Sequence, residues 1–186
     1  MQNLPNILTL FRIGAIPAVY AAFYVPGHIG DWLALGIFAV AGFTDFFDGW
    51  LARKLDVQSG FGRMLHPIAD KLMVATCLML LVGFDIVTDW HMMAAVIILS
   101  REVLVSGLRE YLMELQVALP VSTLAKYKTT IQMVAIGFLL SNGAGEAVLP
   151  GAHIIGLGLL WLAAGLTLIT GYDYVRKGIE HAKWSD

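Results

Sequence analysis

The chain has 186 residues, of which 58% are hydrophobic and 14% are charged, and its formal net charge at pH 7 is −2. With a mean hydropathy of +0.74, this composition excludes an ordinary soluble globular domain, and nothing in the charge balance indicates a nucleic-acid partner. The single cysteine, Cys77, excludes a disulfide framework. The chain is therefore predicted to lie in lipid.

Apolar stretches follow one another along nearly the whole sequence. A helix needs about 20 apolar residues to cross the hydrocarbon core of a bilayer. The predicted spans, in chain order, are residues 7–25, 32–54, 64–86, 90–112, 123–141 and 149–174. We therefore predict an all-α integral membrane protein with six transmembrane helices. Because the spans leave no room for a soluble domain, residues 1–186 are expected to form one domain.

The distribution of basic residues indicates the orientation of these spans. The connections 26–31, 85–91 and 141–153 contain no Lys or Arg, whereas basic residues gather at the opposite ends of the spans. They are Arg53, Lys54, Arg63, Arg109, Lys126, Lys128, Arg176, Lys177 and Lys183. The positive-inside rule then places those ends and both termini in the cytoplasm.

The second predicted span carries an acidic pair toward its cytoplasmic end. On a helix, Asp45 and Asp48 share one face with Gly49 and Ala52. Small residues on that face leave space for a bulky ligand against the backbone, and Arg53 can reach a phosphate. An isolated acidic pair at a helix end is more often a solvated rim, so its neighbours decide between the two interpretations.

The third predicted span adds an imidazole and a carboxylate, because His66 and Asp70 lie one helical turn apart. Carboxylates gathered inside an apolar region repel one another unless cations are bound. Oxygen ligands without thiolate suit Mg²⁺ or Mn²⁺, which share their ligands with a substrate phosphate. The two spans together therefore predict a divalent metal site built from Asp45, Asp48, His66 and Asp70.

These residues form a spaced pattern, Asp45-x2-Asp48-Gly49-x2-Ala52-Arg53-x8-Gly62-x3-His66-x3-Asp70. In every fixed position but one it resembles the signature of the CDP-alcohol phosphatidyltransferase family. The resemblance implies a six-helix membrane enzyme with two metal ions, in which Asp45 and Asp48 are ligands and Asp70 is the general base. It also implies a CDP-lipid site. Its expected residues are Asn6, Thr44, Asp45, Gly49, Ala52, Arg53 and Gly62, with Arg12 beside them.

The exception is His66, which stands where the family has an acidic residue. An imidazole offers one neutral donor, whereas a carboxylate can bridge two cations with a negative charge. Three explanations stay open: a natural or engineered variant that is largely inactive, an active variant with a different metal preference, and a site that holds one metal. We expect impaired activity.

Basic residues in the fourth and fifth predicted spans indicate the acceptor. Arg101 and Arg109 lie two turns apart on one helix face, and Lys126 and Lys128 open the next span. Arg101 lies about ten positions inside its span, where the positive-inside rule does not account for it. Four cations beside a phosphatidyl-transfer centre predict an acceptor that already carries phosphate, such as glycerol 3-phosphate. For Arg101, pairing with Glu102 is the alternative role.

The segments 6–12, 100–110 and 126–133 resemble the branch of the family that makes phosphatidylglycerophosphate. The expected reaction moves the phosphatidyl group of CDP-diacylglycerol to glycerol 3-phosphate and releases CMP, in phospholipid biosynthesis at the bacterial cytoplasmic membrane. Alternatives are another acceptor such as inositol phosphate or serine, a form that binds CDP-lipid without turnover, and a transporter. The concentration of acids near one membrane face disfavours the transporter. A homodimer surrounded by membrane lipids is also implied.

Overall fold

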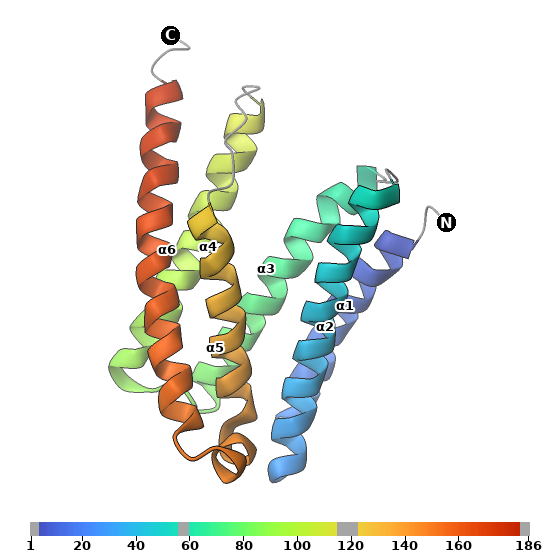
Figure 1. The fold of residues 1–186 in the computed structure, drawn as a ribbon, viewed down its shortest axis with the longest axis vertical. Coiled ribbons are helices and arrows are strands. Elements are labelled where there is room, and N and C mark those ends of the chain that lie inside the picture. Colours follow the sequence, from blue (N-terminus) through green and yellow to red (C-terminus); the bar gives the residue numbers. More distant parts are fainter. Residues whose placement is uncertain (1–3, 56–59, 115–122, 183–186) are drawn as a thin grey trace. The chain divides into compact units, whose positions relative to one another are not determined.

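The computed structural model describes residues 4–55, 60–114 and 123–182 (Figure 1). Side chains are described for residues 9–44, 65, 67–113, 123–176 and 179. In this part of the chain all regular structure is helical. The elements are α1 (Leu4–Ala22), α2 (His28–Leu55), α3 (Gly60–Gly83), the 3-10 turn η1 (Asp89–His91), α4 (Met92–Glu114), α5 (Thr123–Val148) and α6 (Ala152–Ala182).

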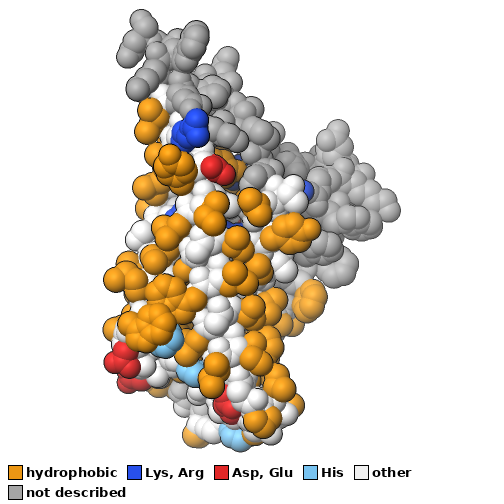
Figure 2. Space-filling model, turned by 60° about the vertical axis from the view of Figure 1, so that its left-hand side comes forward, with side chains coloured by type: hydrophobic (Ala, Val, Ile, Leu, Met, Phe, Trp, Pro, Cys, Tyr) orange, Lys and Arg blue, Asp and Glu red, His pale blue; other side chains and the backbone are white. Residues whose placement is uncertain are grey.

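The prediction of an all-α membrane protein built from six helices is confirmed. By length and composition, three stretches of the described residues can each cross a membrane: Asp89–Met113, Thr123–Val148 and Ala152–Arg176. Thr9–Ala22 is a shorter apolar helix within the predicted first span, and His28–Thr44 is a shorter apolar helix that overlaps the predicted second span. Large hydrophobic side chains such as Val103 lie exposed, and Figure 2 shows one face on which they predominate. Such a surface suits contact with lipid tails rather than water.

The chain divides into two compact units. The first comprises Met1–Ile86 with Ile136–Gly156, and the second comprises Val87–Ala135 with Leu157–Asp186. In the first unit α1 packs against both α2 and α3, and Val19 and Leu78 are fully buried. The assignment of residues 1–186 to one domain stays a prediction.

Helix α5 contains a break close to the predicted end of its span. Asn142 has φ 39° and ψ −126°, which are not helical values, and asparagine tolerates positive φ better than most residues. Beyond the break, the amide of Ala144 donates to Oδ2 of Asp31 over 3.0 Å, and Nδ2 of Asn142 lies 3.4 Å from Oδ1 of the same carboxylate. Asp31 of α2 therefore caps the last turns of α5 from a distant part of the sequence.

The start of α6 is capped in a similar way. Glu146 accepts hydrogen bonds from the amides of Gly151 and His153, each over 2.8 Å. Free amides at a helix start need such acceptors, since their own helix supplies none. The connection between α5 and α6 is thus tied at both ends by carboxylates.

In the second unit η1 is joined to α6 by aromatic contacts. The indole Nε1 of Trp161 donates to Nδ1 of His91 over 3.1 Å. The Trp90 ring stacks on that of Trp161, with centroids 4.9 Å apart. These contacts hold the start of α4 against α6 within this unit.

Candidate active site

Helices α2 and α3 carry the acidic pattern. The backbone is helical at Asp45, Asp48, Gly49, Ala52 and Arg53 in α2, and at Gly62, His66 and Asp70 in α3. The helical spacing on which the shared face depends is therefore present. Apart from Asp70, the side chains of these residues lie outside the described part of the chain, as does that of Asn6. Their roles as metal ligands and CDP-lipid contacts stay predictions.

Two members of the predicted constellation have described side chains. Thr44, predicted to contact the CDP-lipid, donates its hydroxyl hydrogen bond to the carbonyl of Ala41 over 2.8 Å. That bond satisfies the hydroxyl within α2, and the hydroxyl oxygen can still accept. Among the described side chains no cluster of three or more His, Cys, Asp or Glu can hold a metal ion, because the other predicted ligands lie outside this set.

Asp70 forms an ion pair with Arg12, which joins α3 to α1. Nη1 of Arg12 donates to Oδ1 of Asp70, and Nη2 lies 3.4 Å from Oγ1 of Thr9. The side chain of Arg12 is 2% exposed, whereas that of Asp70 is 40% exposed. A buried guanidinium thus holds one oxygen of a carboxylate that remains accessible from outside.

The pairing of Arg12 with Asp70 was missed by the sequence analysis, which placed Arg12 beside the nucleotide. The available signal was an arginine well inside an apolar helix, which needs an anionic partner. Nothing in the local sequence identifies that partner, because Arg12 and Asp70 are 58 residues apart.

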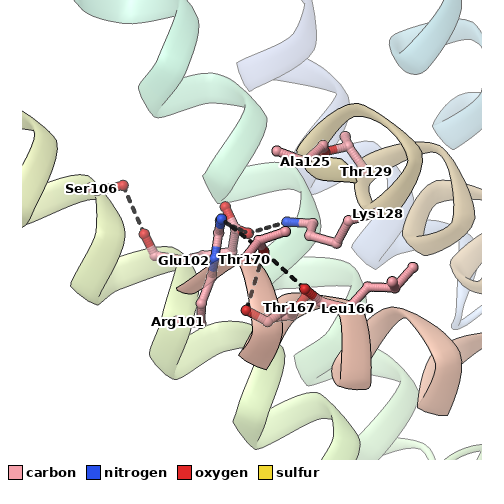
Figure 3. Close-up of polar contacts among 9 residues, drawn as sticks. All are labelled: Arg101, Glu102, Ser106, Ala125, Lys128, Thr129, Leu166, Thr167 and Thr170. Carbon is pink, nitrogen blue, oxygen red and sulfur yellow. Dashed lines mark hydrogen bonds and ion pairs between the residues drawn. The ribbon is translucent and has the colours of Figure 1, made fainter. Parts of the chain in front are cut away.

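A second charged cluster lies among α4, α5 and α6 in the second unit (Figure 3). Nη1 of Arg101 donates to Oε1 of Glu102 over 2.9 Å, and Nζ of Lys128 donates to the same oxygen. Nη2 of Arg101 lies 3.4 Å from Oγ1 of Thr170. The side chains of Arg101, Glu102 and Lys128 are 12%, 19% and 4% exposed. Three charges therefore meet where little water reaches.

Tyr174 and Gly171 shape the space that the Arg101 side chain occupies. Its guanidinium carbon lies 5.9 Å from the ring centroid of Tyr174, a distance suited to a cation–π contact. A Cβ at Gly171 would come within 3.1 Å of Cγ of Arg101. Glycine at this position therefore leaves space for the aliphatic part of the arginine.

The structure brings together two of the four residues predicted to bind the acceptor phosphate. Arg101 and Lys128 meet at Glu102, and the alternative role of Arg101, pairing with Glu102, is observed. Arg109 and Lys126 lie exposed on α4 and α5 and take no part in this cluster. Lys126 and Lys128 face different sides of α5, as two residues that are two positions apart on a helix must.

Comparisons with known proteins identify the family that the sequence pattern resembles. The model of the family described as CDP-alcohol phosphatidyltransferase matches residues 2–169. A protein from Rickettsia bellii named CDP-diacylglycerol--glycerol-3-phosphate 3-phosphatidyltransferase is 44% identical over 175 residues, covering 94% of each chain. A protein of the same name from Cereibacter sphaeroides is 42% identical, covering 97% of each chain. An Arabidopsis thaliana protein with the same name followed by the number 2 is 38% identical, and the match covers 94% of this chain and 79% of the Arabidopsis chain.

The spaced acidic residues on two helices, the six-helix membrane architecture and a family match over most of the sequence lead to one assignment. The chain belongs to the CDP-alcohol phosphatidyltransferase family.

Proposed function

We propose that this chain transfers the phosphatidyl group of CDP-diacylglycerol to glycerol 3-phosphate, producing phosphatidylglycerophosphate and CMP for phospholipid biosynthesis. Family membership supports the transfer chemistry, and the names of relatives at 38–44% identity support the two substrates. The structural observation that carries the choice of acceptor is the meeting of Arg101 and Lys128 inside the second unit. Two cations held together suit a phosphorylated acceptor better than a neutral alcohol.

In this proposal the acceptor phosphate binds Lys128, with Arg101 assisting. Lys128 is nearly buried, so its charge is weakly screened and attracts an anion strongly. Arg109 and Lys126 are exposed on the same two helices, outside the cluster, and they are proposed to attract the phosphorylated acceptor by their charge.

The CDP-lipid head group is proposed to bind along the family pattern of α2 and α3. Its proposed contacts are Asn6, Thr44, Asp45, Gly49, Ala52, Arg53 and Gly62. The proposed ligands of divalent metal, Mg²⁺ or Mn²⁺, are Asp45, Asp48, His66 and Asp70. This donor set fits such ions, because it offers carboxylate oxygens and an imidazole but no thiolate. When bound, the ions neutralise phosphate oxygens and the charge on the departing CMP.

Asp70 is proposed to act as the general base. Its side chain is 40% exposed, so an acceptor hydroxyl can approach it, while Arg12 holds one of its oxygens. Asp70 takes the proton of the acceptor hydroxyl as the hydroxyl oxygen attacks the phosphorus on the lipid side. The new P–O bond forms while the bond to CMP breaks, and CMP leaves with the bonding electrons.

The proposed setting is the bacterial cytoplasmic membrane, with the active site and both termini on the cytoplasmic side. The basic residues at one end of the spans support this orientation. A homodimer surrounded by membrane lipid is proposed from family resemblance.

The test is CMP release by the purified chain in mixed micelles, with CDP-diacylglycerol and a panel of acceptors. We expect glycerol 3-phosphate to be the preferred acceptor, with low turnover because His66 replaces an acidic ligand. The His66→Asp variant should be more active, since a carboxylate restores the negative donor that can bridge two cations. Absence of metal-dependent CMP release with every acceptor, in both forms, would refute the enzyme proposal.

A second candidate follows from His66, namely a protein that binds CDP-lipid but does not turn it over. It predicts tight binding of CDP-diacylglycerol by the unchanged chain with negligible product, and product formation only in the His66→Asp variant. Equal turnover by both forms would exclude it.

A further inference from the structure

We infer that Glu102 is a positioning residue, whose carboxylate holds Arg101 of α4 and Lys128 of α5 at one point and thereby preforms the binding place for the acceptor phosphate. This inference rests on the proposed function. Glu102 does not itself contact the acceptor, and it acts through the two cations.

A single oxygen, Oε1 of Glu102, accepts from both Nη1 of Arg101 and Nζ of Lys128, which are contributed by different helices (Figure 3). A carboxylate oxygen has two lone pairs and can accept both hydrogen bonds at once. The shared oxygen therefore fixes the separation of the two cations, which long flexible side chains would not maintain alone.

Two cations and one carboxylate leave an excess of one positive charge in a nearly buried cluster. Without Glu102, Arg101 and Lys128 would repel each other at weak screening. With Glu102 in place this repulsion is offset, and a phosphate can balance the remaining positive charge.

The cluster also has spare hydrogen-bonding capacity. Nε of Arg101 and Oγ1 of Thr167 are buried and make no hydrogen bond in the described structure. Thr167 lies one turn from Thr170, which receives the other Arg101 bond. Buried donors without a partner need an explanation, and an anion bound beside the net positive charge supplies one. This capacity fits a cluster that receives a phosphate as well as joining helices.

A different role for Glu102 predicts the opposite change in anion affinity when its charge is removed. If Glu102 merely occupied the place of the phosphate, neutralising it would free both cations and strengthen anion binding. If Glu102 instead positions the two cations, neutralising it weakens anion binding. Glu102→Gln preserves the shape of the side chain and removes its charge, so it separates the two possibilities.

The experiment measures the Kd of glycerol 3-phosphate by calorimetry, and kcat and KM for both substrates, in the parent chain and in Glu102→Gln. Loss of a charged hydrogen-bond partner corresponds to about a 10- to 100-fold change. We expect an increase of this size in the Kd and KM for glycerol 3-phosphate, with KM for CDP-diacylglycerol unchanged. Glu102→Asp, which keeps the charge, should recover part of the affinity.

Two further variants control the result. Asp173→Asn removes an exposed acid from α6 and should leave all constants unchanged. Lys128→Met should weaken acceptor binding by itself, and adding Glu102→Gln to it should cost less than the sum of the single changes, because both act through one contact. Thermal unfolding of every variant reports whether it is folded.

Unchanged or tighter binding of glycerol 3-phosphate in folded Glu102→Gln would overturn the inference, as would additive effects of the two changes. Transfer to glycerol 3-phosphate by the parent would still support the proposed function in that case. If instead the parent uses only a different acceptor, the proposed function fails. The Kd of inorganic phosphate in the parent and in Glu102→Gln then decides the inference, which requires weaker phosphate binding in the variant.

Discussion

Replacing Arg12 by methionine tests whether the chain orients its proposed base through a buried cation. Arg12→Met keeps a long side chain at a position that is 2% exposed, while it removes the donor to Oδ1 of Asp70. The carboxylate stays in place on α3 but loses the group that fixes its rotation. We expect a loss of turnover that exceeds the loss of substrate binding.

The magnitude follows from the ion pair. A hydrogen bond between charged groups contributes about 1.5–3 kcal/mol when neither partner is hydrated. Because the side chain of Asp70 is 40% exposed, water can take the vacated place, and the lower part of that range applies. Since a tenfold change in rate corresponds to about 1.4 kcal/mol, kcat should fall roughly 10- to 30-fold.

Arg12→Lys keeps the charge but cannot direct separate nitrogens to both Asp70 and Thr9 as the guanidinium does. Its kcat should lie between those of the parent and Arg12→Met. The assay is CMP release at saturating substrates, in the unchanged chain and in a His66→Asp background. Lys71→Met, which removes the cation next to Asp70 in the chain, is the matched control and should change kcat less than about twofold.

The orienting role of Arg12 would be refuted by folded Arg12→Met that retains kcat within a factor of two of the parent. Equal losses in Arg12→Lys and Arg12→Met would show that the two guanidinium nitrogens, and not the charge alone, orient Asp70. A rise in KM for both substrates at constant kcat would indicate a role in binding instead.

Three other perturbations have defined outcomes. Chelation of divalent metal should abolish CMP release, and Mn²⁺ or Mg²⁺ should restore it; activity that survives exhaustive chelation contradicts the metal proposal. Asp31→Ala removes the acceptor for the amide of Ala144 and should destabilise the chain by about 0.5–2 kcal/mol, seen as a lower unfolding midpoint. Trp161→Phe keeps an aromatic ring but loses the hydrogen bond to His91, at a cost of about 0.5–1.5 kcal/mol; an unchanged midpoint would argue against that bond.

Much of the fold was predictable because, in lipid, a backbone must satisfy its hydrogen bonds within its own segment. The length of each apolar run therefore predicts a helix without knowledge of its neighbours, and the six predicted spans correspond to α1 to α6. The predicted span 123–141 ends next to the break at Asn142, but α5 continues to Val148. That continuation depends on Asp31, a capping residue supplied by α2, which local sequence does not reveal.

The residue types of the candidate site indicate its chemistry, which stays a prediction. Carboxylates, an imidazole and inward arginines in apolar helices are costly, so their presence indicates a charged substrate or ion. Of the acceptor residues, however, helical spacing could not distinguish Lys128, which is buried, from Lys126, which is exposed. The rotation of α5 against its neighbours within the second unit decides this.

The sequence by itself determined the number and order of the helices and the family, because each depends on local composition or on spacing along one helix. Only the tertiary structure decided which charges pair, namely Arg12 with Asp70 across 58 residues and Lys128 with Glu102 across 26. The physical reason is that an ion pair depends on the distance between two side chains after helices pack. Helix periodicity specifies the face on which a charge lies but not the partner that the face meets.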